Sequence, residues 1–85
     1  MEYIAVAFRS RSETVKFYEY VSAYGVNAEI INTPKEAGVG CGLSTKIYGL
    51  ETAVIKRAVR AFNGKSFAGV FLVKTTGGKR FVVSV

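Results

Sequence analysis

The alternation of short apolar runs with two longer amphipathic segments constrains the fold of this chain more than any other feature. Runs of about four to eight apolar residues favour buried strands, whereas apolar positions spaced three or four residues apart favour helices. The pattern predicts helices over residues 13–24 and 51–62. It predicts strands over residues 3–8, 26–32, 43–48, 67–73 and 81–85. The first strand is apolar throughout, so we expect it to be buried on both faces.

The resulting order is β-α-β-β-α-β with an extra C-terminal β-strand, which is typical of an α+β, ferredoxin-like two-layer sandwich. Right-handed crossover connections would place both helices on one face of the sheet. We expect one domain over residues 1–85. We also expect strands one, two and four to run the same way, so that the segments after them share one rim of the sheet. That rim would gather Arg9, Arg11, Lys35, Cys41, Lys74, Lys79 and Arg80.

Local signals predict the ends of these elements. Ser10 and Glu13 have the spacing of a capping box, in which the hydroxyl accepts from the helix and the carboxylate reaches back. Gly25 stands where a left-handed residue would end the first helix, and residues 63–64 (Asn-Gly) end the second. Residues 77–78 (Gly-Gly) predict a hairpin turn before the last strand.

The inventory of side chains excludes several kinds of active site. The chain has no His and no Asp, and Cys41 is its single cysteine. This excludes nucleophiles assisted by imidazole, zinc sites built by one chain, EF-hand loops and internal disulfides. We therefore expect no metal and no cofactor. No apolar run approaches the roughly 18 residues of a membrane span. The first residues carry no basic segment, so we expect no signal peptide and a reducing, cytoplasmic location.

Cys41 belongs to a glycine-rich loop, residues 35–42, between the second and third predicted strands. Gly40 and Gly42 flank it and allow the backbone to approach a partner molecule closely. The thiolate is the reactive form of cysteine, and nearby cations or a helix N-terminus favour it. One interpretation of Cys41 is a nucleophilic or group-carrying thiolate. The other is a small apolar residue packed at the start of the third strand.

Residues 33–44, Thr-Pro-Lys-Glu-Ala-Gly-Val-Gly-Cys-Gly-Leu-Ser, resemble the Pro-Arg-Glu…Ser-Cys-Gly-Leu/Ile stretch of the selenium/sulfur carrier-like family of small bacterial domains. The resemblance maps the family's cysteine, proline and basic residue onto Cys41, Pro34 and Lys35. It implies a sandwich fold and a thiol that holds sulfur or selenium as a persulfide or its selenium equivalent. Lys35 stands in place of the usual Arg, and Gly38 and Gly40 stand in place of serines. The last hairpin, residues 74–85, extends beyond the family pattern.

The residues and the resemblance together predict a carrier or binding domain rather than an enzyme. Cys41 would accept sulfur or selenium, and a donor or acceptor protein would be its partner. The cations expected to stabilise the anionic thiolate are Arg9, Arg11 and Lys35. The residues expected to shape the loop are Pro34, Gly40 and Gly42.

Two alternatives stay open. A net charge of +6, from 12 basic and 6 acidic residues, also fits a non-enzymatic anion- or RNA-binding module. The RNA-recognition fold needs aromatic residues on its central strands, whereas the similar segment here, residues 79–83, lies on the last one. Lys56 and Arg60, one helical turn apart with no acid opposite, are compatible with an anionic partner. Tyrosines of the first helix and the free edge of the last strand are compatible with a homodimer or a regulatory domain.

Overall fold

The computed structural model describes residues 2–40 and 42–85 of the chain. Its elements in chain order are β1 (Glu2–Phe8), α1 (Arg11–Ser22), β2 (Ala28–Asn32), the short 3-10 helix η1 (Lys35–Ala37), β3 (Leu43–Ile47), α2 (Thr52–Phe62), β4 (Phe67–Thr76) and β5 (Lys79–Ser84). The predicted helices and strands are confirmed, with shifts of a few residues at their ends. Cys41 lies outside the described residues, so its predicted role stays a prediction.

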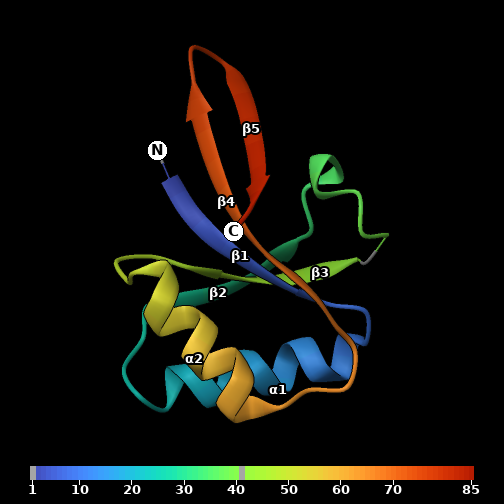
Figure 1. The fold of residues 1–85 in the computed structure, drawn as a ribbon, viewed down its shortest axis with the longest axis vertical. Helices are drawn as coiled ribbons and strands as arrows, with labels where there is room; N and C mark the ends of the chain where they lie inside the picture. Colours follow the sequence, from blue (N-terminus) through green and yellow to red (C-terminus); the bar gives the residue numbers. More distant parts are fainter. Residues whose placement is uncertain (1, 41) are drawn as a thin grey trace.

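The described strands form one open sheet in the order β2-β3-β1-β4-β5, and each pairs with its neighbours in antiparallel fashion. Both helices lie on the same face of this sheet, as Figure 1 shows. The predicted α+β class with two layers is therefore confirmed. The complete strand order, with β5 at one edge, is not that of the four-stranded ferredoxin-like sandwich.

The predicted direction of the fourth strand is wrong. β4 pairs directly with β1 and runs antiparallel to it, with Glu2 opposite Lys74 and Phe8 opposite Phe67. The hairpin turn after β4 therefore lies at the end of the sheet where β1 begins, and not where β1 ends (Figure 1). The single rim expected to gather every loop cation does not exist.

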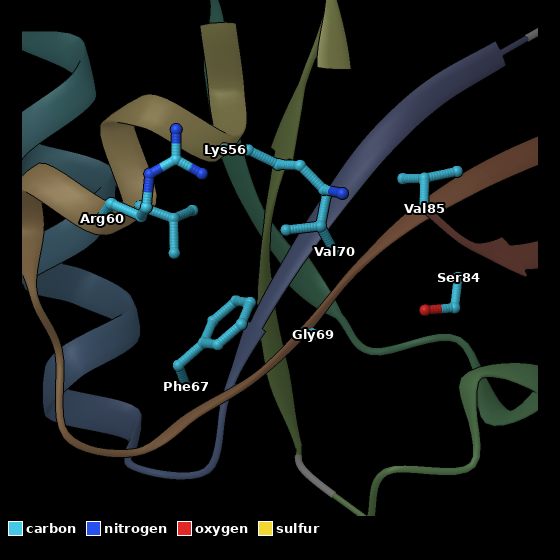
Figure 2. A pocket seen from close by; sticks show the side chains of 8 residues that line it. Lys56, Arg60, Phe67, Gly69, Val70, Ser84 and Val85 are labelled. Atoms are coloured by element: carbon cyan, nitrogen blue, oxygen red, sulfur yellow. The ribbon is translucent and has the colours of Figure 1, made fainter. Parts of the chain in front are cut away.

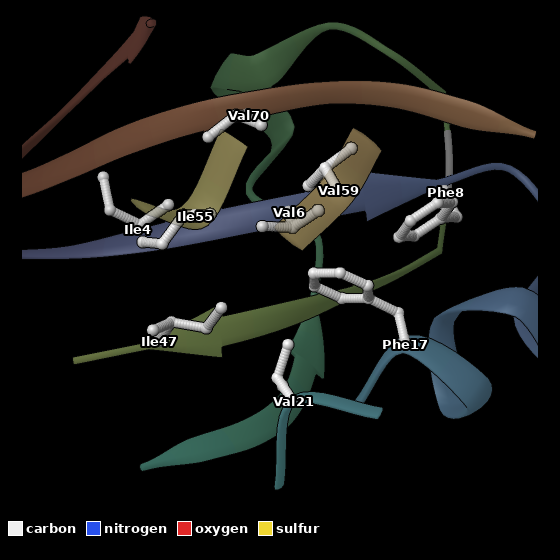
Figure 3. Packing of buried hydrophobic residues seen from close by; sticks show 9 residues of the cluster. All are labelled: Ile4, Val6, Phe8, Phe17, Val21, Ile47, Ile55, Val59 and Val70. Atoms are coloured by element: carbon white, nitrogen blue, oxygen red, sulfur yellow. The ribbon is translucent and has the colours of Figure 1, made fainter. Parts of the chain in front are cut away.

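The core lies between the helices and the sheet and is built by alternate residues of the strands. Ile4, Val6 and Phe8 of β1 face the helices, and all three are buried. Figure 3 shows Phe17 of α1 and Val59 of α2 pointing toward this row. The ring centroids of Phe8 and Phe17 are 5.3 Å apart. Full burial of one such side chain contributes about 1.5–3 kcal/mol to folding, so this row holds the two layers together.

The first strand is also buried on its other face, as predicted. Ala5 and Ala7 have no exposed surface, and Val73 of β4, on the same face, has none either. Arg80 of β5 lies opposite Thr75, two residues beyond Val73, and so shares this second face. It bonds to Glu36 of η1. The chain between β2 and β3 therefore reaches the face of the sheet that the helices leave uncovered.

The predicted capping box at the start of α1 forms only in part. The amide of Glu13 donates to the Ser10 hydroxyl over 3.3 Å. The Glu13 carboxylate, however, accepts from the amides of Lys65 and Ser66, over 2.9 and 2.7 Å, and from the Ser66 hydroxyl. These bonds, the Ser66 hydroxyl first among them, lower the pKa of Glu13. The carboxylate thus fastens the start of α1 to the segment between α2 and β4, and does not return to Ser10.

Candidate functional site

The glycine-rich segment between β2 and β3, residues 33–42, is called the loop below. Two contacts close its base. The Thr33 amide donates to the Gly42 carbonyl oxygen over 3.1 Å. The hydroxyls of Thr33 and Ser44 share a hydrogen bond of 2.7 Å. Cys41 lies outside the described residues, but the contacts fix Gly42, the residue that directly follows it in the sequence.

The first half of the loop contains η1 and two glycines in the left-handed region. Pro34 precedes η1 and is buried, whereas Lys35 begins it and is exposed. Gly38 has a φ of 67° and Gly40 a φ of 69°. L-residues with side chains seldom adopt such values, so a serine at either position would be strained. This gives a physical reason for the glycines that stand where the family pattern has serines.

An ion pair connects the loop to the edge of the sheet. The Arg80 guanidinium donates to both carboxylate oxygens of Glu36, through Nη2 over 2.7 Å and through Nε over 3.1 Å. This two-pronged geometry fixes orientation as well as distance. Hydrogen bonding from Arg80 is the main reason that the pKa of Glu36 is lowered. Arg80 is therefore near the loop as predicted, but as the partner of a carboxylate.

Arg11 is the predicted cation that the structure brings against the base of the loop. It is the first residue of α1. A Cβ atom built on Gly42 would lie 3.9 Å from the Nη2 atom of Arg11. The guanidinium therefore lies close to the backbone of the residue that follows Cys41. A positive group and the N-terminal end of a helix both favour an anion nearby.

The other predicted cations are distributed more widely. Lys35 belongs to the loop and, among the described residues, has no ion-pair partner. The amide of Arg9 donates to the Ser66 carbonyl over 2.8 Å, and within the described part of the chain its side chain makes no polar contact with the loop. Lys74 lies 4.0 Å from Glu2 at the opposite end of β1, and Lys79 begins β5 beside the hairpin turn. The prediction that Lys74 joins the loop is wrong, whereas that for Lys79, which precedes Arg80 in β5, stays a prediction.

Sequence reasoning missed three residues that support the loop: Thr33, Glu36 and Ser44. Thr33 and Ser44 close the base, and Glu36 anchors η1. A Thr just after one strand and a Ser near the start of the next are too common in sequences to predict a hydrogen bond between them. Glu36 is 44 residues from Arg80 in the sequence, so no local signal links them.

Within residues 2–40 and 42–85, no three His, Cys, Asp or Glu side chains lie close enough together to hold a metal ion. In the same residues, neither helix has the length and apolar character needed to cross a bilayer.

The fold and the loop together define a small α+β domain whose glycine-rich loop lies beside the N-terminus of a helix. The model of the family described as "Putative Se/S carrier protein-like" matches residues 2–68, about four fifths of the chain. The chain belongs to this family, and the predicted resemblance is confirmed. The matched range contains the whole loop and ends at the start of β4, so most of the β4–β5 hairpin lies beyond it. No curated protein and no solved structure matches the chain.

Proposed function

We propose that this protein is a sulfur or selenium carrier in which Cys41 is the accepting group. The observation that carries the proposal is the family match, which includes the loop and its single cysteine. The two-layer α+β fold, with both helices on one face of an antiparallel sheet, is compatible with this role. The partners in this account are a donor and an acceptor protein, and the chain itself is a carrier rather than an enzyme.

The chemistry requires no oxidant. The Cys41 thiolate attacks the outer sulfur of a donor persulfide, R–S–SH. The S–S bond of the donor breaks, its electron pair leaves with the donor as the thiolate R–S⁻, and a new S–S bond forms on Cys41. The product is Cys41–S–SH, and the proton stays on the transferred sulfur. A donor that carries selenium as R–S–SeH reacts in the same way to give Cys41–S–SeH. Delivery to an acceptor thiolate is the reverse exchange.

Two cations support the thiolate in this account. The Arg11 guanidinium approaches the backbone of Gly42, next to Cys41 in sequence. Lys35 is the exposed first residue of η1 and forms no ion pair with an acidic side chain among residues 2–40 and 42–85. Both effects favour the ionised form of a nearby thiol. Arg9, which lies between β1 and α1, adds positive charge near the same end of α1.

The loop residues have supporting roles in the proposal. Pro34 is buried and anchors the start of η1, and Gly40 has a backbone conformation that suits glycine. Gly42 lies beside Arg11, whose Nη2 atom would be 3.9 Å from a Cβ atom built on it. A reducing, cytoplasmic setting suits this function, because a lone thiol stays free there.

The test is mass spectrometry of the whole chain after incubation with a small persulfide such as glutathione persulfide. We expect the wild-type chain to gain the mass of one sulfur atom, and the gain to disappear after treatment with a thiol reductant. Cys41→Ser should gain nothing. The proposal fails if the wild-type chain gains no sulfur under conditions in which free cysteine does.

A second candidate, binding of single-stranded RNA, draws on one observation. Tyr3 of β1 and Tyr48, directly after β3, flank Lys46 on the face of the sheet away from the helices. The Lys46 ammonium lies 4.6 and 4.8 Å from their ring centroids. Aromatic residues beside a cation can stack bases. Salt-dependent binding of oligouridine that survives Cys41→Ser but is lost in Tyr3→Leu would favour this candidate.

A further inference from the structure

An open pocket of about 330 Å³ lies between α2 and the end of the β4–β5 hairpin, on the helix side of the sheet. It shares no residue with the loop, and Figure 2 shows it from close by. The residues that line it are Lys56, Val59, Arg60, Phe67, Gly69, Val70, Ser84 and Val85. Pockets that hold small molecules in proteins begin at about 300 Å³, so this one suits a small organic ligand and not a folded partner.

Two cations lie along one side of the pocket. Lys56 and Arg60 are one turn apart on α2, and both line the space. Within residues 2–40 and 42–85, neither makes an ion pair or a side-chain hydrogen bond. Like charges at this spacing disfavour the helix slightly. An anion bound between them would remove that repulsion and would gain two charge-assisted hydrogen bonds.

The floor of the pocket is apolar and includes an exposed aromatic ring. Val59 and Val70 belong to the core and are 8% and 4% exposed. Phe67 is 41% exposed, and its ring lies beside the open space below Arg60 in Figure 2. An exposed ring at the edge of a concave site offers a face or an edge to another ring. Cations above an apolar floor define an amphipathic site, with a charged end and an apolar end.

The end of the chain beyond the family match supplies the far wall. The Val85 amide donates to the Val70 carbonyl over 3.0 Å, which fixes the last residues beside β4. Ser84 also lines the pocket, but it lies opposite Phe71, which pairs with Ala5 on the second face of the sheet, so its hydroxyl is not directed toward α2. Ser84 and Val85 lie outside residues 2–68. The pocket is therefore completed by residues that lie outside the matched range.

We propose that this pocket binds a small organic anion with an aromatic body and one carboxylate or phosphate group. The guanidinium of Arg60 suits the planar or forked oxygens of either head group, and Lys56 adds a point charge. The aromatic body packs on Phe67 and covers the apolar floor. This site is independent of the chemistry proposed for Cys41.

The test is a ¹H–¹⁵N NMR titration of the whole chain with phenyl phosphate and, separately, with phenylacetate. We expect saturable shifts confined to amides of 56–60, 67–70 and 84–85 with at least one of the two. The more strongly bound probe identifies the head group. Inorganic phosphate, which lacks the body, and benzyl alcohol, which lacks the charge, should each bind about tenfold or more weakly, because each loses one half of the contacts.

Matched variants distinguish specific binding in this pocket from nonspecific attraction of an anion to the basic surface. The double variant Lys56→Gln/Arg60→Gln should weaken binding of the aromatic anion about tenfold or more, through loss of two charge-assisted hydrogen bonds. Arg57→Gln removes one charge from the same helix at a residue that does not line the pocket, and should leave binding nearly unchanged. Phe67→Leu should weaken phenyl phosphate but not inorganic phosphate. The proposal is overturned if inorganic phosphate binds as well as both aromatic anions, if Arg57→Gln weakens binding as much as the double variant, or if the shifts fall elsewhere.

Discussion

Arg80 of β5 donates two hydrogen bonds, of 2.7 and 3.1 Å, to the carboxylate of Glu36 in η1, and this contact connects the edge strand to the glycine-rich loop. β5 lies beyond the family match at residues 2–68. The strand that holds the loop from the second face of the sheet therefore lies outside the matched residues. Both side chains are partly exposed, and such pairs contribute little to global stability. The contact acts mainly on the position of the loop.

Arg80→Gln should loosen the loop without unfolding the protein. We expect amide hydrogen exchange to become faster in residues 35–40, while the melting temperature changes little, since the pair is a surface contact. Arg57→Gln, which removes an exposed charge that makes no described ion pair, is the control and should leave the exchange as it is. Unchanged loop exchange in Arg80→Gln would show that the ion pair does not hold η1.

The Glu13 carboxylate should make stability depend on acid pH. Its pKa is lowered in the folded chain, chiefly by the Ser66 hydroxyl, from an ordinary value of 4.5. A lowered pKa means that the stabilisation is complete above 4.5 and is lost as pH falls through the folded value. Glu13→Gln should therefore melt at a lower temperature than wild type at pH 7, and the difference should shrink below pH 4.5.

Glu19→Gln is the control for Glu13→Gln, because Glu19 is an exposed glutamate on the same helix and makes no described side-chain hydrogen bond. We expect its melting curve to follow that of wild type throughout. A gap between Glu13→Gln and wild type that stays constant down to pH 3 would contradict the role of the ionised carboxylate.

Gly64→Ala should destabilise the aromatic part of the core. A Cβ atom at residue 64 would lie 2.7 Å from Phe8 Cε1 and 2.9 Å from Phe62 Cε2, both closer than real contacts allow. Overpacking of this kind costs about 1–3 kcal/mol. Chemical denaturation measures the loss. Gly42→Ala is the matched control, since its new Cβ would meet nothing closer than 3.9 Å. Equal stability of the two variants would refute the packing argument.

The sequence was sufficient for the elements because their signals are local. The apolar run of residues 3–8 became β1, and Asn63 ends α2 with a left-handed φ of 55°. Two of the contacts that were missed, Glu13 with Ser66 and Glu36 with Arg80, join residues that are distant in sequence. The Glu13 carboxylate accepts from the amide of Ser66, 53 residues away, and therefore does not complete the local capping box. The direction of β4 depends on its pairing with β1, which no feature of residues 67–76 reveals alone.

The candidate site could be predicted from the sequence only in part. Arg11 was expected near the loop because the turn after the first strand and the loop after the second share one end of the sheet, and the structure brings it against Gly42. Lys74 was expected there for a topological reason that fails, and it lies beside Glu2. Thr33 and Ser44 carry ordinary hydroxyls, whose partnership appears only when β2 and β3 pair.

The rate of alkylation of Cys41 by iodoacetamide, measured against pH in the native chain, tests the central claim most directly. We predict a titration midpoint below the ordinary cysteine value of about 8.5, because Arg11 and Lys35 favour the thiolate. Arg11→Gln should move the midpoint toward the ordinary value, whereas Arg57→Gln should not move it. An ordinary midpoint in wild type, equal midpoints in the two variants, or alkylation only after unfolding would contradict the account of Cys41 as an activated carrier thiol.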